Sequence, residues 1–340
     1  MTTSDRKAGW KGPTIQQVAE VSGVGPATVD RVLNNRPGVR EQTRQRVRIA
    51  FEKLRQETSD AKPLRIALHC ESGDSFNGEV RSAIRALHRS EPGVVVSSAF
   101  TMTNELDANV FAASLLEDGG RTDGSVVVAR EHPAINSAIR QLRRAGKPVV
   151  CLTSDLPSSR RNTYVGNDQH AAGGVAAQVI GRSLPKASLR ILLIMSAAFR
   201  SQKDREMGFR RVLRASFPHL RIEERLFSDD SPETTRQQLA DYFDLNGVPP
   251  AIYNVAGANR GVAQALEDTG RAEDTILVGH ELTPVSRRLL QAGTMDFIVS
   301  HDLEAELTQA VRWIGAFLEG VTSEPDPTQI LLHTRYNCGA

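Results

Sequence analysis

Residues 14–44 read TIQQVAEVSGVGPATVDRVLNNRPGVREQTR and predict two short helices joined by a tight turn. Thr14 can cap a helix that begins at Ile15, and the side chain of Gln17 can return a hydrogen bond to the cap. Apolar residues then recur at helical spacing until the sequence Ser22-Gly23-Val24 interrupts the pattern. This break has the length of the turn in a helix-turn-helix unit.

The second helix of this unit is predicted to be short, with one apolar side. Gly25 precedes it, and Pro26 takes the first helical position, where the missing N–H of proline costs nothing. The helix is short enough to enter the major groove of DNA, and its outward residues are Ala27, Asp30, Arg31 and Asn34. A third helix over about 41–54 would close a small core. A helical bundle without a DNA-binding role is the alternative, but the caps, the turn and the third helix all agree with the first interpretation.

Residues 14–47 resemble the DNA-binding headpiece of the lac-repressor family, because they follow its pattern T-I-x-x-V-A-x-x-x-G-V-x-x-x-T-V-x-R-V-L-N and then V-x-x-x-T-R-x-x-V. The resemblance implies that the partner is double-stranded DNA with a pseudo-palindromic operator, read by the two headpieces of a homodimer. Ala27, Asp30 and Arg31 would face the bases. The full set of DNA-binding residues that it implies is Thr14, Pro26, Ala27, Thr28, Asp30, Arg31, Asn34, Thr43 and Arg44.

The chain has 340 residues, which is too long for one compact core. Its formal net charge is only +2, but residues 1–62 hold 12 Lys/Arg against 7 Asp/Glu, which leaves 30 against 33 for the rest. A basic N-terminal region followed by a mildly acidic remainder favours contact with DNA phosphates through the N-terminal region. The predicted domains are a flexible N-terminus (1–13), a headpiece (14–55), a linker (56–63) and a ligand-binding core (64–340).

Cysteine usage and the N-terminal sequence favour a cytoplasmic protein. Cys70, Cys151 and Cys338 lie far apart without metal-ligand spacing, as expected of reduced, buried thiols. The first residues lack the apolar segment of a signal peptide, and no stretch is long and apolar enough for a membrane span. We therefore expect a cytoplasmic location and no membrane partner.

From Leu64 onward, apolar strand-like runs alternate with helical patterns, which predicts an α/β fold with parallel sheets. Ligands of such folds bind beyond the carboxyl ends of the strands. The residues after the predicted strands are rich in Asp, Asn, Arg and Glu with an aromatic residue, Phe76, among them. This mixture is the chemistry of a sugar or polyol site, where a ring stacks on C–H groups and polar side chains bind hydroxyls.

The same core resembles the periplasmic-binding-protein-like core of the lac-repressor family. Arg205-Glu206-Met207-Gly208-Phe209 is similar to the family's Arg-x-x-Gly-aromatic motif, and the segment 279–284 to Gly-x-Asp-x-Thr-Pro, with Glu281 in place of the aspartate. The resemblance implies two Rossmann-like lobes, at about 64–162 with 297–322 and about 163–296 with 323–340. The ligand-binding residues expected from position and resemblance are Asp74, Ser75, Phe76, Arg130, Asp155, Arg205, Asn254, Asn259, Glu281 and His301.

Several of these residues have a structural interpretation beside the functional one. Phe76 can belong to the core, Glu281 can cap the following helix, and His301 can be a buried structural histidine. Asp168 is expected to cap the helix that begins at Gln169 rather than to contact a ligand.

The sequence therefore predicts a transcription regulator, most simply a repressor, that senses a small sugar or polyol. No metal-ligand set, nucleophile with a nearby base, or nucleotide loop occurs at usable spacing, so we expect no cofactor, no metal, no catalytic residue and no enzyme activity. The linker lacks the hinge-helix pattern of lac-repressor relatives. The alternative is a cytoplasmic sugar-binding protein without DNA regulation.

Overall fold

The computed structural model describes residues 13–34, 36–57, 62–196 and 199–339. The predicted flexible N-terminus lies outside the described residues, apart from Pro13, as does half of the predicted linker, residues 58–61. The chain forms two compact units. The small one is built around the residues up to Leu64 with Gly93–Val95 and Gly315–Thr322, and the large one holds the rest.

The headpiece consists of helices α1 (Ile15–Ser22), α2 (Pro26–Leu33) and α3 (Glu41–Glu57). The predicted capping box is present, with the Gln17 backbone N–H donating to Thr14 Oγ1 and the Gln17 side chain accepting from the Thr14 backbone N–H. Gly25 and Pro26 occupy the predicted cap and first helical position of α2. The buried core of the three helices is Val18, Val29, Val32, Val47 and Ala50. The helix α3 continues to Glu57, so the first two residues of the predicted linker are helical.

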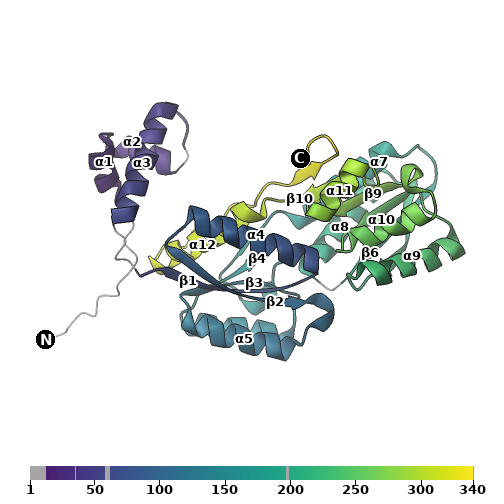
Figure 1. Cartoon of the computed structure of the whole chain (residues 1–340), viewed down its shortest axis with the longest axis horizontal. Helices are drawn as coiled ribbons and strands as arrows, with labels where there is room; N and C mark the ends of the chain where they lie inside the picture. Colours follow the sequence, from purple (N-terminus) through teal and green to yellow (C-terminus); the bar gives the residue numbers. More distant parts are fainter. Residues whose placement is uncertain (1–12, 35, 58–61, 197–198, 340) are drawn as a thin grey trace. The chain divides into compact units, whose positions relative to one another are not determined.

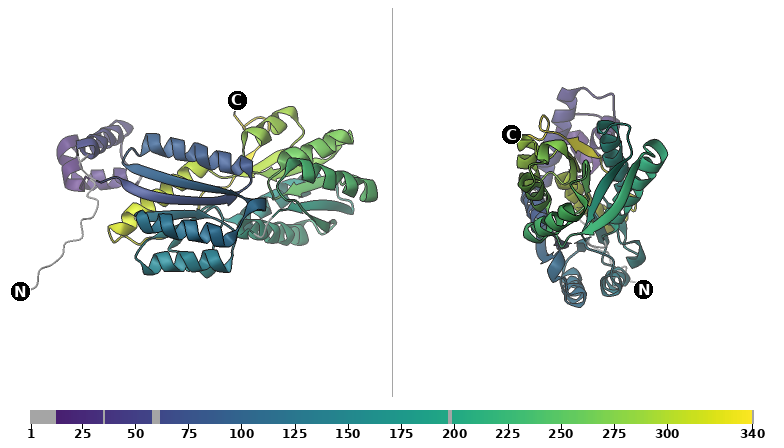
Figure 2. Two further views of the ribbon diagram at one scale, coloured as in Figure 1. Left: turned by 60° about the horizontal axis from the view of Figure 1, so that its bottom comes forward. Right: turned by 90° about the vertical axis from the view of Figure 1, so that its right-hand side faces the viewer.

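The first sheet of the core has the strand order β2-β1-β3-β4-β5, and its pairs from β1 to β5 are parallel. Helices α4 (Asp74–Ser90) and α12 (Leu303–Leu318) cover one face, while α5 (Ala108–Arg121) and α6 (Pro133–Arg144) cover the other (Figures 1 and 2). The strands are β1 (Leu64–Ser72), β2 (Val94–Met102), β3 (Gly124–Val128), β4 (Val149–Leu152) and β5 (Thr163–Val165).

The second sheet has the order β11-β10-β9-β8-β6-β7, in which only the edge strand β11 runs antiparallel to its neighbour among the described strands. Its strands are β6 (Leu189–Met195), β7 (Leu220–Phe227), β8 (Ala251–Asn254), β9 (Ile276–His280), β10 (Phe297–Ser300) and β11 (Leu331–His333). One apolar cluster packs α7 (Gln169–Ser183) and α8 (Arg200–Ser216) on one face. Another packs the opposite face, with α9 (Pro232–Asn246), α10 (Asn259–Asp268) and α11 (Pro284–Ala292).

The α/β fold class with parallel sheets is confirmed, but two strands lie on the other side of the expected lobe boundaries. The strand β5 pairs with β4 in the first sheet, and β10 pairs with β9 in the second. The first two crossovers come directly after strands, β5 and then β10, and each leads into a helix, α7 and then α12. We therefore propose lobe boundaries after β5 and after β10, with α12 in the first lobe.

Helices α7 and α8 approach each other closely enough to require two glycines. A Cβ on Gly173 would lie 1.8 Å from the backbone oxygen of Arg205, and a Cβ on Gly208 would lie 1.8 Å from that of His170. Since both obstacles are backbone atoms, neither can move without moving a helix. The Gly208 of the Arg-x-x-Gly-aromatic motif thus sets the position of the helix that carries Arg205.

Candidate ligand-binding site

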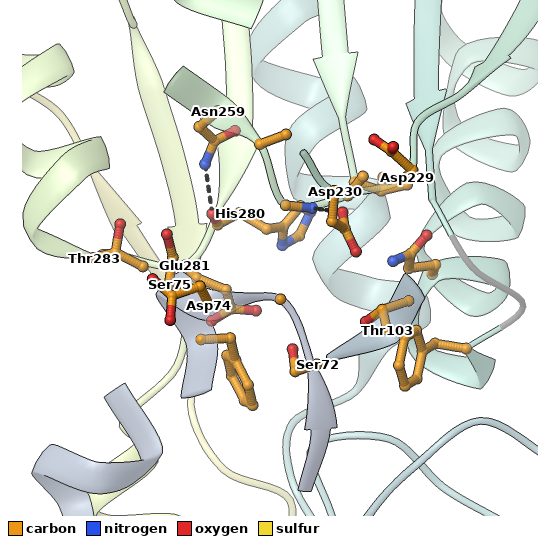
Figure 3. A pocket seen from close by; sticks show the side chains of 18 of the residues that line it. Ser72, Asp74, Ser75, Thr103, Asp229, Asp230, Asn259, His280, Glu281 and Thr283 are labelled. Atoms are coloured by element: carbon orange, nitrogen blue, oxygen red, sulfur yellow. Dashed lines mark hydrogen bonds between the residues drawn. The ribbon is translucent and has the colours of Figure 1, made fainter. Parts of the chain in front are cut away.

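A cavity of about 450 Å³ lies where the carboxyl ends of the two sheets meet within the large unit. Its lining comes mainly from the segments that follow β1, β2 and β4 in the first sheet and β6, β7, β8 and β9 in the second. Figure 3 shows side chains from both sheets pointing into this space, among them Ser72, Thr103, Asp230 and Glu281. A volume of this size suits a small ligand such as a monosaccharide.

Left-handed backbone conformation is concentrated around the cavity. Five non-glycine residues of the described chain have positive φ, and four of them line the cavity: Thr153 (60°), Asp230 (65°), Ala258 (53°) and Glu281 (65°). Each follows a strand of one of the two sheets. Such strain persists only where the surrounding structure imposes it, and it is found preferentially at binding sites.

Arg205 lines the cavity from the second turn of α8, but its guanidinium is already bound by protein groups. Nε donates to Gln169 Oε1 at 2.7 Å, and Nη2 donates to Glu281 Oε1 at 2.9 Å. Its side chain is only 5% exposed. The arginine is therefore fixed in place before any ligand arrives.

These contacts continue into a closed set of polar contacts that we call the hinge network: Thr153, Gln169, Arg205, Glu281, His301 and Glu306. The ring nitrogens of His301 lie 3.0 Å from Glu281 Oε2 and 2.7 Å from Glu306 Oε2. These are ion pairs without the straight geometry of good hydrogen bonds. Thr153 closes the set, since its hydroxyl donates to Glu306 and its backbone oxygen accepts from Gln169.

The hinge network lies where the chain passes between the lobes. Gln169 begins the helix after the first crossover, and His301 lies in the second. Thr328, in the third crossover, donates its hydroxyl to Glu306 at 2.5 Å. All three crossovers are thus joined to one buried set of side chains, of which Arg205 and Glu281 also line the cavity.

His301 carries a proton in this network. Burial disfavours the imidazolium, but the two carboxylates outweigh it and raise the pKa of His301 to about 10. Burial alone would raise the pKa of Glu281, yet His301 and Arg205 hold it well below its usual range. The network is therefore a buried set of alternating charges at neutral pH.

Of the ten residues predicted to bind ligand, six line the cavity: Asp74, Ser75, Phe76, Arg205, Asn259 and Glu281. The other four do not. Arg130 donates to the buried Glu71 and to the Thr103 backbone oxygen, and Asp155 accepts from Arg161 at 2.5 and 2.8 Å. Asn254 donates to Asn259 at 2.7 Å, and His301 belongs to the hinge network.

The helix caps near the site show whether Asp168 and Glu281 cap helices. The Asp168 side chain accepts from the Ala171 N–H, so Asp168 caps α7 as expected. Thr283, with Ser286, caps α11. The alternative that Glu281 caps this helix was therefore wrong, and its carboxylate lies against Arg205 and His301 instead.

Sequence reasoning missed several lining residues, chiefly Asp229, Asp230, Thr103 and Gln202. Asp229 and Asp230 follow β7, a strand that was not among those predicted. Its sequence LRIEERLF alternates only at its ends, because the register against β6 shifts within the strand. The run Ser-Asp-Asp-Ser-Pro directly after it is the signal that could have marked a strand end.

The predicted DNA-binding residues lie on all three headpiece helices or their caps. Pro26, Ala27 and Arg31 are exposed on α2. Asp30 is less available than expected, since it accepts hydrogen bonds from Asn34 at 2.8 Å and Arg36 at 3.1 Å. The other predicted positions are Thr14 in its capping box, Thr28 on α2, and Thr43 and Arg44 in the first turn of α3.

Thr103 supplies a test of whether the cavity is a binding site. Its Oγ1 is buried without a hydrogen-bond partner in the described chain, and its residue is 8% exposed. Thr103→Val should leave the thermal melting temperature unchanged or slightly raised, because an unsatisfied hydroxyl is replaced by a methyl group of similar shape. The same change should weaken binding of the ligand by about 1 kcal/mol if that hydroxyl bonds to it. Thr122→Val, which removes a hydroxyl that is already bonded, is the control and should lower the melting temperature.

Comparison with known proteins gives two family matches. Residues 14–56 match the model of the bacterial regulatory proteins of the lacI family, and residues 69–322 match the periplasmic binding protein domain. Comparison with curated proteins gives no match. Among the described residues, no helix has the length and apolar character needed to cross a membrane.

Solved structures share the fold of the core at low sequence identity. The glucose-galactose binding protein GanP from Geobacillus stearothermophilus is 20% identical with a TM-score of 0.72, covering 82% of this chain and 100% of that one. A carbohydrate transporter solute binding protein from Agrobacterium radiobacter, in complex with D-arabinose, is 17% identical with a TM-score of 0.74 (82% and 96%). A putative LacI transcriptional regulator from Bacteroides fragilis is 18% identical with a TM-score of 0.70 (81% and 98%).

Proposed function

Because this chain belongs to the lacI family of bacterial regulatory proteins and carries a core of the periplasmic binding protein family, we propose that it is a transcription regulator whose operator binding is controlled by a small sugar or polyol. We further propose that it is a repressor and works as a homodimer. One headpiece contacts too few bases for specificity, so two must read the half-sites of a pseudo-palindrome. A protein that acts on operator DNA works beside the chromosome, so we assign it to the cytoplasm.

The observation that carries the proposal is the junction between the cavity and the hinge network. Arg205 and Glu281 line the cavity and are at the same time bonded into a network that touches all three crossovers. A ligand that binds them acts directly on the segments that join the two lobes. A ligand controls DNA binding only if it binds one arrangement of the two lobes more tightly than the other. A ligand with equal affinity for both arrangements would not shift the equilibrium between them.

The experiment is to recover and sequence fragments of the source genome bound by the purified full chain, with and without a panel of sugars and polyols. We expect enrichment of a pseudo-palindromic sequence that one compound class alters. If fragments are enriched but no compound alters them, control by a sugar or polyol is contradicted. If none is enriched under any condition, the binding-protein alternative replaces the regulator.

Replacing Arg31 with alanine tests the DNA-binding surface. Arg31 is exposed on α2 and makes no ion pair among the described residues. If it contacts a base, Arg31→Ala should weaken operator binding by about 1–3 kcal/mol and leave ligand binding unchanged. Arg221→Ala, which removes an exposed arginine from the core, is the charge-matched control. Equal operator affinity of the Arg31 variant and the wild type would remove Arg31 from the interface.

A further inference from the structure

The arginines close to the cavity are committed to protein partners. Arg205 donates to Gln169 and Glu281, and Arg130 donates to Glu71 and to a backbone oxygen. In each guanidinium, Nε and Nη2 are thus taken by acceptors of the protein. Arg260, in the first turn of α10, is exposed and lines the cavity, so it is the available cation of the lining among the described residues.

Two amide side chains of the lining, Gln202 and Asn259, are likewise bonded within the protein. Gln202 accepts from the Ser196 N–H at 3.0 Å and donates to Ser196 Oγ at 2.9 Å. Asn259 donates to the His280 backbone oxygen at 3.1 Å, the contact drawn in Figure 3, and accepts from Asn254. Each of these two amides therefore uses part of its hydrogen-bonding capacity within the protein.

Carboxylates, in contrast, are abundant and mostly without a cation. Six acidic residues line the cavity against two arginines. Glu71 and Glu281 have ion pairs, with Arg130 and Arg205. In the part of the chain that the structure describes, no ion pair is formed by the other four, which are Asp74, Asp229, Asp230 and Glu233. Most of the carboxylates that line the cavity therefore have no partner of opposite charge among the described residues.

Asp230 is the best placed of these four. It is half-buried and has left-handed backbone (φ 65°), and its Oδ1 accepts from the Gly257 N–H at 2.8 Å. Burial raises its pKa, because the hydrogen bonds from Ser196 and Gly257 and the more distant charge of Arg130 offset only part of the cost of the buried charge. In Figure 3 the carboxylate lies near the middle of the cavity and points toward Ser72 from the opposite sheet. A cationic donor placed beside this carboxylate would stabilise its charged form and offset the cost of burying the charge.

The unpartnered hydroxyl of Thr103 is an independent sign that a polar ligand completes this part of the cavity. Thr103 comes from the first lobe and Asp230 from the second, and both line the same space. A buried hydroxyl without a partner among the described residues destabilises the folded protein. A hydrogen bond to a polar group of the ligand would remove this cost.

Building on the proposed function, we propose that the effector carries an ammonium group, as an amino sugar or amino polyol does, and that Asp230 binds this group while the remaining carboxylates accept hydroxyls. The same lining disfavours phosphorylated or acidic sugars, since their charge would meet four carboxylates that form no ion pair among the described residues, and a single available arginine. Arg205 then orients Glu281, and Arg130 orients Glu71.

The test measures binding to the full chain by calorimetry and by melting temperature, using matched compounds. The set is glucosamine, galactosamine and mannosamine, the corresponding neutral hexoses, their 6-phosphates, and the small amino polyol serinol. We expect at least one amino compound to bind at least about tenfold more tightly than its neutral counterpart, and the phosphates to bind more weakly than either. Asp230→Asn should reduce that ratio toward one, while Asp241→Asn, an exposed aspartate on α9 away from the cavity, should leave it unchanged.

Equal or tighter binding of the neutral or phosphorylated compound overturns the proposal, and so does the absence of binding by every amino compound. Failure of this inference is distinguishable from failure of the proposed function. If a neutral sugar alters operator binding with no preference for the amine, the regulator stands and the ammonium-bearing effector falls. If operator fragments are recovered but respond to no compound, both fall.

Discussion

Replacing His301 with leucine should lower the free energy of unfolding by about 3–5 kcal/mol at neutral pH. The histidine lies between Glu281 and Glu306, and the Glu306 side chain has no exposed surface. Leucine fills a similar volume but carries no charge, so the buried Glu306 loses its cation among the described residues and Glu281 keeps only Arg205. Removing the cation from a buried ionic set costs far more than the set contributes when intact, because the remaining charges stay desolvated.

The pH dependence separates this explanation from simple loss of packing. In the wild type, the pKa of His301 lies near 10, above the 6.5 of the unfolded chain. The stability due to its charge is therefore complete below about pH 6.5 and is lost as the pH rises toward 10. The leucine variant should lack this loss and should instead recover stability as the pH falls, since its buried carboxylates take up protons.

Denaturant unfolding of both proteins across pH 5–10 measures these slopes. His88→Leu, at an exposed histidine on α4, is the control and should change stability by less than about 0.5 kcal/mol. If wild type and His301→Leu show parallel pH profiles, the histidine is neutral in the folded protein and the charge assignment of the hinge network is wrong.

Replacing Gly208 with alanine should also cost about 3 kcal/mol or more, at the upper end of what overpacking usually costs. The new Cβ would stand 1.8 Å from the His170 backbone oxygen, so α7 and α8 must separate. Their separation would move Arg205 away from Glu281, so the ligand affinity of the folded fraction should fall as well. Melting temperature and calorimetric titration measure the two effects.

Gly78→Ala is the matched control for Gly208→Ala. Gly78 lies within α4, and a Cβ there meets no atom within 4 Å. Alanine should therefore stabilise this helix by about 0.5–1 kcal/mol through its higher helix propensity. A Gly208 variant as stable as the wild type would show that the two helices can separate without loss.

How far sequence alone predicts this protein depends on the range of the interactions that form each part. The headpiece helices were predicted almost to the residue because their signals are local, as in the Thr14–Gln17 capping box and the Gly25-Pro26 start of α2. The α/β class followed from strand-like runs repeated along the chain. The positions of Arg205, Glu281 and Phe76 at the cavity could be expected from strand ends and motif spacing.

Partners distant in sequence could not be predicted in the same way. Arg130 follows a strand as a ligand-binding residue would, but its partner Glu71 lies on β1, 59 positions earlier. The sequence around His301 is compatible with a structural role and with a ligand role, and its two carboxylate partners come from different lobes. Only the folded chain shows that these charges neutralise each other, and that the aspartates after β7 form no ion pair among the described residues.

The place of α12 in the fold has a consequence for the order in which the protein can mature on the ribosome. This helix is near the end of the chain, yet Ile314 packs against Gly124 of β3, and Arg312 pairs with Glu91 after α4 at 2.7 Å. The first lobe, although its strands are synthesised first, cannot be completed until residues 303–318 have emerged. The headpiece has its own core and is released about 250 residues earlier, so a nascent chain presents a finished DNA-binding unit long before the part that regulates it exists.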